Sequence, residues 1–123
     1  MKYSCKITGW GDEALDFMTD PDMNFIILFN ETAPAELADI AILHTEATLT
    51  EDPAVGDLLT IGTKVFKVTA VGEEAKHTLR DLGHCTIDFK GGDTPERPGC
   101  IMVEGVENLV PADIQKDVVI TLS

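Results

Sequence analysis

Hydrophobic and polar residues alternate along much of the chain, which is the pattern of strands with one buried face. Residues 2–9 place Tyr3, Cys5 and Ile7 on one face and polar side chains on the other. Residues 24–30 form a near-continuous apolar run, which indicates a strand covered on both faces. Further short strands are predicted in segments 41–49, 84–89, 100–103 and 117–122.

Turn and helix signals divide these strands. Segment 57–71 predicts a hairpin with Gly62 and Thr63 at the turn, because a Gly-X pair suits a type II′ turn. Segment 73–82 predicts a helix that Gly83 ends, with two glutamates at its positive end. Its apolar face is expected to comprise Ala75, Leu79 and Leu82. Segment 31–40 predicts one or two helical turns, with Thr32 as the cap and Pro34 at the start.

These elements predict a mainly β protein: a small closed β-barrel of about six to eight short strands with one or two short helices. A barrel fits short strands better than a sandwich does, because closure removes exposed sheet edges. With 123 residues, of which 44% are hydrophobic, the chain can bury one core. We therefore expect residues 1–123 to form a single domain.

The charge balance narrows the class of partner. Nine basic and 22 acidic residues give a net charge of −13, which argues against binding nucleic acid or an anionic membrane surface. It favours partners with a basic patch. The apolar run 25–29 is too short to span a bilayer, so no direct membrane insertion is expected. Three cysteines without CxxC spacing and the lack of a signal peptide predict free thiols and a cytoplasmic protein.

The candidate chemistry rests on three histidines. His77 lies on the solvated side of the predicted helix. His44 ends an apolar run and shares a strand face with Glu46, whereas His84 shares a face with Thr86. For each of these two, packing is the commoner explanation. A metal site formed by His44, Glu46 and His84 is an alternative, although no HxxxH or CxxC spacing supports it.

Two longer motifs carry a family resemblance. Residues 68–72 (VTAVG) and 79–89 (LRDLGHCTIDF), with 33–37 (APAEL) upstream and 98–103 (PGCIMV) downstream, resemble the glucitol/sorbitol-specific enzyme IIA component of the bacterial phosphotransferase system (PTS). The resemblance runs from about Ile7 to about Ile120, and the stretch 68–89 is long and unusual in composition.

The resemblance implies a cytoplasmic phosphocarrier with a small closed barrel and no cofactor. It implies that a phosphoryl group arrives from the phosphocarrier HPr and leaves to the IIB domain of the glucitol/sorbitol permease, which also has a IIC component. The carrier would associate with the membrane permease transiently. The family's phospho-accepting histidine corresponds to His44, which we expect to be exposed at a strand end. His84 corresponds to the second histidine of that site, as an orienter or as a phosphate contact.

Imidazole chemistry agrees with this role, because one ring nitrogen can attack phosphorus while a hydrogen bond fixes the tautomer at the other. The hydroxyls of Thr45 and Thr86 are candidate phosphate contacts. Glu46 is a third candidate at the phosphate site and could instead orient the imidazole. It stands where family members can carry a further histidine, and its carboxylate would repel phosphate, so as an orienter it ranks below His84. Rival interpretations are a relative serving another sugar or phosphoryl partner, a metal-binding barrel, and a regulatory relative that accepts no phosphate.

Overall fold

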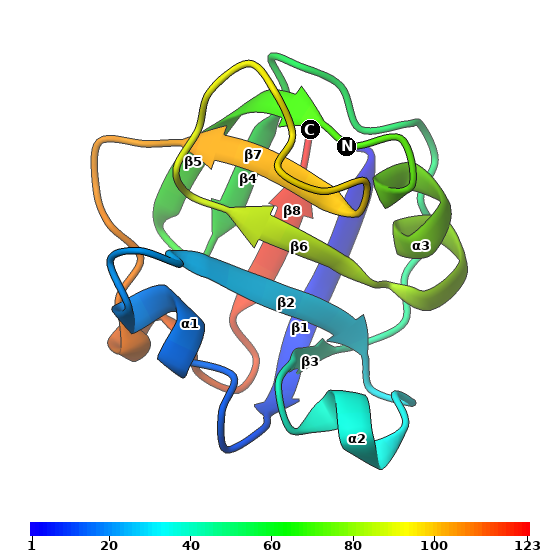
Figure 1. The fold of residues 1–123 in the computed structure, drawn as a ribbon. Coiled ribbons are helices and arrows are strands. Elements are labelled where there is room, and N and C mark those ends of the chain that lie inside the picture. The colour runs from blue at the N-terminus through cyan, green and yellow to red at the C-terminus, as the bar shows by residue number, and fades with distance from the viewer.

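The computed structural model describes residues 1–123 as a closed barrel of eight strands (Figure 1). The strand order around the barrel is β1-β3-β2-β6-β7-β5-β4-β8. The strands are β1 Tyr3–Trp10, β2 Phe25–Asn30, β3 Ile42–His44, β4 Leu58–Ile61, β5 Lys64–Val71, β6 Cys85–Asp88, β7 Cys100–Glu104 and β8 Val119–Leu122. The helices are α1 Asp16–Thr19, α2 Ala35–Ala38, α3 Ala75–Leu82 and the 3₁₀ turn η1 Pro111–Asp113.

The predicted fold class is confirmed, and so are the predicted strand segments except 41–49, in which only Ile42–His44 is a strand. The hairpin between β4 and β5 closes through Gly62 and Thr63, and of these two only Gly62 has a positive φ, of 61°, as a type II′ turn requires. Two elements were missed, α1 and η1. Each is a single turn, which is too short to show a helical period.

Two parallel strand pairs determine which loops meet. Most neighbours are antiparallel, but β2 runs parallel to β3, with Asn30 opposite His44, and β6 runs parallel to β7. Because β6 is antiparallel to β2, the start of β6 lies beside the end of β2. The C-terminal ends of β2 and β3 and the turn from α3 into β6 therefore meet at one end of the barrel, on the right in Figure 1.

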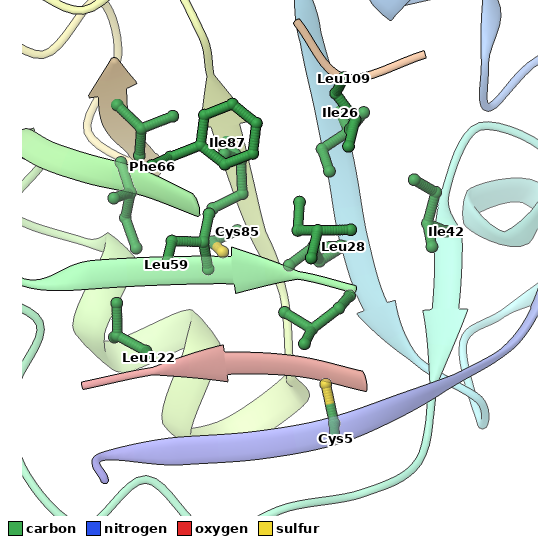
Figure 2. Packing of buried hydrophobic residues seen from close by; sticks show 14 of the residues in the cluster. Cys5, Ile26, Leu28, Ile42, Leu59, Phe66, Cys85, Ile87, Leu109 and Leu122 are labelled. Carbon is green, nitrogen blue, oxygen red and sulfur yellow. The ribbon is translucent and has the colours of Figure 1, made fainter. Parts of the chain in front are cut away.

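Inward-facing side chains fill the barrel with one core cluster of 22 buried residues. Figure 2 shows side chains from opposite walls meeting there, among them Leu28, Ile87 and Leu122. Cys5 and Cys85 point into this core as small apolar residues. All three cysteines are free and buried, as the spacing predicted. The longest helix has eight residues, and no helix is long and apolar enough to cross a membrane.

Two local expectations were wrong. The side chain of Thr32 does not cap α2, because its hydroxyl donates to Asn30 Oδ1 and Pro34 stands at the N-cap. Leu82 does not share the buried face of Ala75 and Leu79; it is 44% exposed. It is the last residue of α3, where the chain turns away through Gly83 toward β6. A period of 3.6 residues places Leu82 on the helix face but does not say where the barrel wall ends.

Candidate functional site

His44 is the last residue of β3, where it lies opposite Ile7 of β1 and Asn30 of β2. Its side chain is on the same side of the strand as that of Ile42, which belongs to the core. The exposed fraction of His44 is 0%, so the expectation that it is exposed at a strand end was wrong. The register of β3 directs the ring inward, and the turn at Gly83 covers it.

Both ring nitrogens of His44 face backbone carbonyls. Nδ1 lies 2.8 Å from the carbonyl oxygen of Thr45, and Nε2 lies 2.8 Å from that of Gly83. Tyr3 meets the ring edge-on, with the centroids 6.1 Å apart. A neutral imidazole has one N–H and can donate to only one of these carbonyls at a time. When Nδ1 donates to Thr45, the lone pair of Nε2 faces the carbonyl oxygen of Gly83.

Gly83 forms the roof over this ring. It ends α3 in the left-handed conformation with φ of 63°, and its N–H donates to the carbonyl of Leu79. A Cβ atom built on Gly83 would lie 2.6 Å from His44 Cε1 and 3.1 Å from Asn30 Cβ. Both the backbone conformation and the close approach of the imidazole therefore require glycine here. The sequence predicted the left-handed helix end at Gly83, but it did not predict the close contact with the His44 ring.

His84 lies on the other side of the barrel wall. It precedes β6, in which Cys85 and Ile87 face the core, so alternation directs His84 outward. Its Nδ1 lies 3.0 Å from the carbonyl oxygen of Leu28, and its ring stacks on Phe29 with the centroids 4.8 Å apart. His84 is half-buried. Gly83, which precedes His84 in the chain, contacts the His44 ring through its carbonyl oxygen. The ring nitrogens of His44 face carbonyl oxygens and do not bond to His84.

The remaining predicted site residues differ in their distance from His44. Thr45 follows it directly, but the Thr45 hydroxyl accepts a hydrogen bond of 3.0 Å from the Lys6 N–H and so joins the chain to β1. Thr86 lies opposite Ile27 within β6, one step along the outer face from His84. Glu46 is exposed and lies beyond the end of β3. His77 is exposed on α3, as predicted.

A polar pocket of about 290 Å³ opens over the Gly83 turn. It is lined by Tyr3, Asn30, Thr32, Glu46, Ala47, Arg80, Asp81, Leu82 and Gly83. Four of these polar residues, Asn30, Thr32, Arg80 and Asp81, were not among the predicted site residues. Arg80 stands within the quoted motif LRDLGH. Its presence in the pocket depends on where α3 docks, which no local sequence pattern records.

The structure does not assemble the metal alternative. No group of three or more His, Cys, Asp or Glu side chains is positioned to hold a metal ion. His44 turns inward to Gly83 while His84 turns outward to Phe29, and this separation prevents the two rings from sharing a ligand with Glu46.

Comparison with known proteins places the barrel in a family. The sequence model of the family described as the PTS system glucitol/sorbitol-specific IIA component matches residues 2–121. The chain belongs to this family.

Two relatives carry the same family description. This IIA family member is 37% identical to the PTS system glucitol/sorbitol-specific EIIA component of Escherichia coli (strain K12), over 91% of its own length and 86% of the relative's. Identity and coverage are the same for the component of that description from Shigella flexneri. The fold of the present chain is similar to the crystal structure of a PTS system IIA component from Enterococcus faecalis V583. The TM-score is 0.72 and the identity 26%, over 96% of this chain and 97% of that one.

Proposed function

We propose that this IIA family member is a phosphocarrier that accepts a phosphoryl group from phospho-HPr on His44. It then passes the group to the IIB domain of the glucitol/sorbitol permease. The observation that carries the proposal is the setting of the His44 ring. Nδ1 is held by the carbonyl of Thr45, while Nε2 points to Gly83, the residue that separates it from the polar pocket.

Both ring nitrogens lie 2.8 Å from a carbonyl oxygen, but only Gly83 lines the pocket, so in this proposal Nε2 is the attacking atom. With the proton on Nδ1 donated to Thr45, the Nε2 lone pair forms a new N–P bond as the P–N bond of the donor phosphohistidine breaks. The electron pair of the broken bond returns to the donor ring, which leaves as neutral imidazole when its other nitrogen is protonated. The proton on Nδ1 stays in place and stabilises the phosphorylated ring through its hydrogen bond to Thr45.

The Gly83 carbonyl must move before transfer. Its oxygen lies 2.8 Å from Nε2, in the direction from which phosphorus would approach. Glycine can change its backbone angles with little steric cost, which suits a turn that both covers and uncovers the nucleophile. In this proposal His84 is a positioning residue, because its hydrogen bond to the Leu28 carbonyl and its stacking on Phe29 anchor the residue next to Gly83.

The charge of the chain fits brief contact with basic surfaces. A net charge of −13 steers partners by electrostatic attraction without a large apolar interface. We propose a cytoplasmic protein that meets HPr and the membrane permease in turn. The permease would bind the polyol, and this protein would carry only the phosphoryl group.

Incubation with phosphoenolpyruvate, enzyme I and HPr, followed by intact-mass measurement, tests the proposal. The wild type should gain the mass of one phosphoryl group in acid-labile form. His44→Gln should gain none, and His84→Gln should gain it more slowly. A wild type that gains no mass would refute the carrier function, whereas a phosphorylated His44→Gln would refute the assignment of the nucleophile.

A further inference from the structure

The polar pocket over Gly83 has an unusual charge pattern for an acidic protein. Glu46 and Asp81 contribute carboxylates to its lining, and Arg80 contributes the one cation. A phosphoryl group bonded to an imidazole adds about two negative charges. Held among two carboxylates, such a group would be repelled unless a cation compensates. Arg80 is placed to supply that compensation.

The guanidinium of Arg80 makes two contacts within its own helix and keeps further N–H donors for a ligand. Its Nη2 lies 3.1 Å from His77 Nδ1 and its Nε lies 3.4 Å from Asp81 Oδ1, and both partners belong to α3. The side chain is 50% exposed. An arginine has five N–H donors in a planar fork, so these two contacts leave the others available for phosphate oxygens.

The last turn of α3 connects Arg80 to the nucleophile. Residues three apart lie on the same side of a helix, so Arg80 and Gly83 are neighbours at its end. Gly83 in turn contacts His44 through its carbonyl. A shift of this turn that withdraws the carbonyl from Nε2 would open His44 to the pocket that Arg80 lines.

Lys2 and Lys76 are engaged in ion pairs elsewhere. Lys2 binds both carboxylate oxygens of Asp57, at 2.9 and 2.8 Å. Lys76, on the same helix as Arg80, pairs with Asp52 at 3.6 Å. Neither lysine lines the pocket.

We propose that this pocket holds the phosphoryl group on His44 and that Arg80 binds its oxygens, an inference that rests on the carrier function proposed above. Arg80 would neutralise the charge that develops on the oxygens during transfer and would stabilise the phosphohistidine afterwards. An arginine in this position suits the planar, paired recognition of phosphate oxygens better than a lysine.

The test compares two phosphoryl donors, phospho-HPr and phosphoramidate. With phosphoramidate, the Nε2 lone pair of His44 attacks phosphorus and ammonia leaves with the electron pair of the broken P–N bond. This small donor needs no protein docking, so it separates phosphoryl binding from partner recognition. The variants are Arg80→Gln and Arg80→Lys. Lys76→Gln is the matched control, because it removes the same charge from the same helix outside the pocket.

Arg80→Gln should be phosphorylated about 10- to 100-fold more slowly by both donors, Arg80→Lys should recover part of the rate, and Lys76→Gln should change it less than about twofold. The ³¹P chemical shift of the phosphohistidine should move in Arg80→Gln and stay in Lys76→Gln. Circular dichroism verifies folding of each variant.

Slowing with phospho-HPr alone would overturn the inference and make Arg80 a docking residue. Equal rates in Arg80→Gln and Lys76→Gln would also overturn it, while the carrier function stands. A wild type that accepts phosphate from neither donor would refute the carrier function and this inference with it.

Discussion

His44 and His84 meet at the same end of the barrel, yet the structure gives them opposite surroundings. His44 is fully buried on the inner face with a carbonyl at each ring nitrogen. His84 is half-buried on the outer face, with one nitrogen on the Leu28 carbonyl and its ring on Phe29. Strand register, rather than residue type, therefore decides what a histidine at a strand end can do.

Gly83 connects the surroundings of the two histidines. The carbonyl of Gly83 faces His44, while the next residue, His84, is anchored to the outer wall. A change at Gly83 should therefore disturb the inner face most, a change at Phe29 the outer face, and the buried thiols should report whether the inner face is closed.

The largest effect is expected from Gly83→Ala. The left-handed φ of 63° and a Cβ only 2.6 Å from His44 Cε1 together should lower the free energy of unfolding by about 2–4 kcal/mol. Urea denaturation measures this change. The displaced ring should also accept phosphate more slowly, which intact mass against time measures.

Gly92→Ala is the control for Gly83→Ala. Gly92 has a φ of +91° with nothing within 4 Å of an added Cβ, so only backbone strain of about 1–2 kcal/mol is expected. Equal losses of stability in the two variants would contradict the view that contact with His44 restricts position 83 to glycine.

A smaller effect is expected on the outer face. Phe29→Leu removes the ring on which His84 stacks and should lower the free energy of unfolding by about 1 kcal/mol beyond the loss of buried area. Combining Phe29→Leu with His84→Gln in a double-mutant cycle should give a coupling of about 0.5–1.5 kcal/mol. Strictly additive losses would mean that the two rings do not stabilise each other.

The smallest effect is expected from thiol labelling, which tests without mutation whether the inner face of the barrel is closed. Burial raises the pKa of the Cys5 and Cys85 thiols to about 12, and burial also raises the pKa of Cys100. Because the thiolate is the reactive form, a disulfide reagent at pH 8 should label none of these thiols in the folded protein and all three after unfolding. Rapid labelling of Cys5 or Cys85 in the folded state would show that the barrel opens easily.

The barrel itself could be predicted from the sequence because its information is local. Alternation marked the strand from residue 2, Gly62 marked the hairpin turn, and Gly83 marked the end of α3. The motif around LRDLGH also led to the correct family. Single-turn α1 and η1 escaped because they are shorter than any period that could reveal them.

The sequence alone therefore determined the class of fold, the family and the two histidines worth considering. Only the tertiary structure decided that His44 is buried, that His84 faces away from it, and that Arg80 lies in the pocket above them. The physical reason is the parallel pairing of β2 with β3, together with the contact of α3 with β2 and β6. These contacts join residues dozens of positions apart, and no local period or turn signal records which of them will meet.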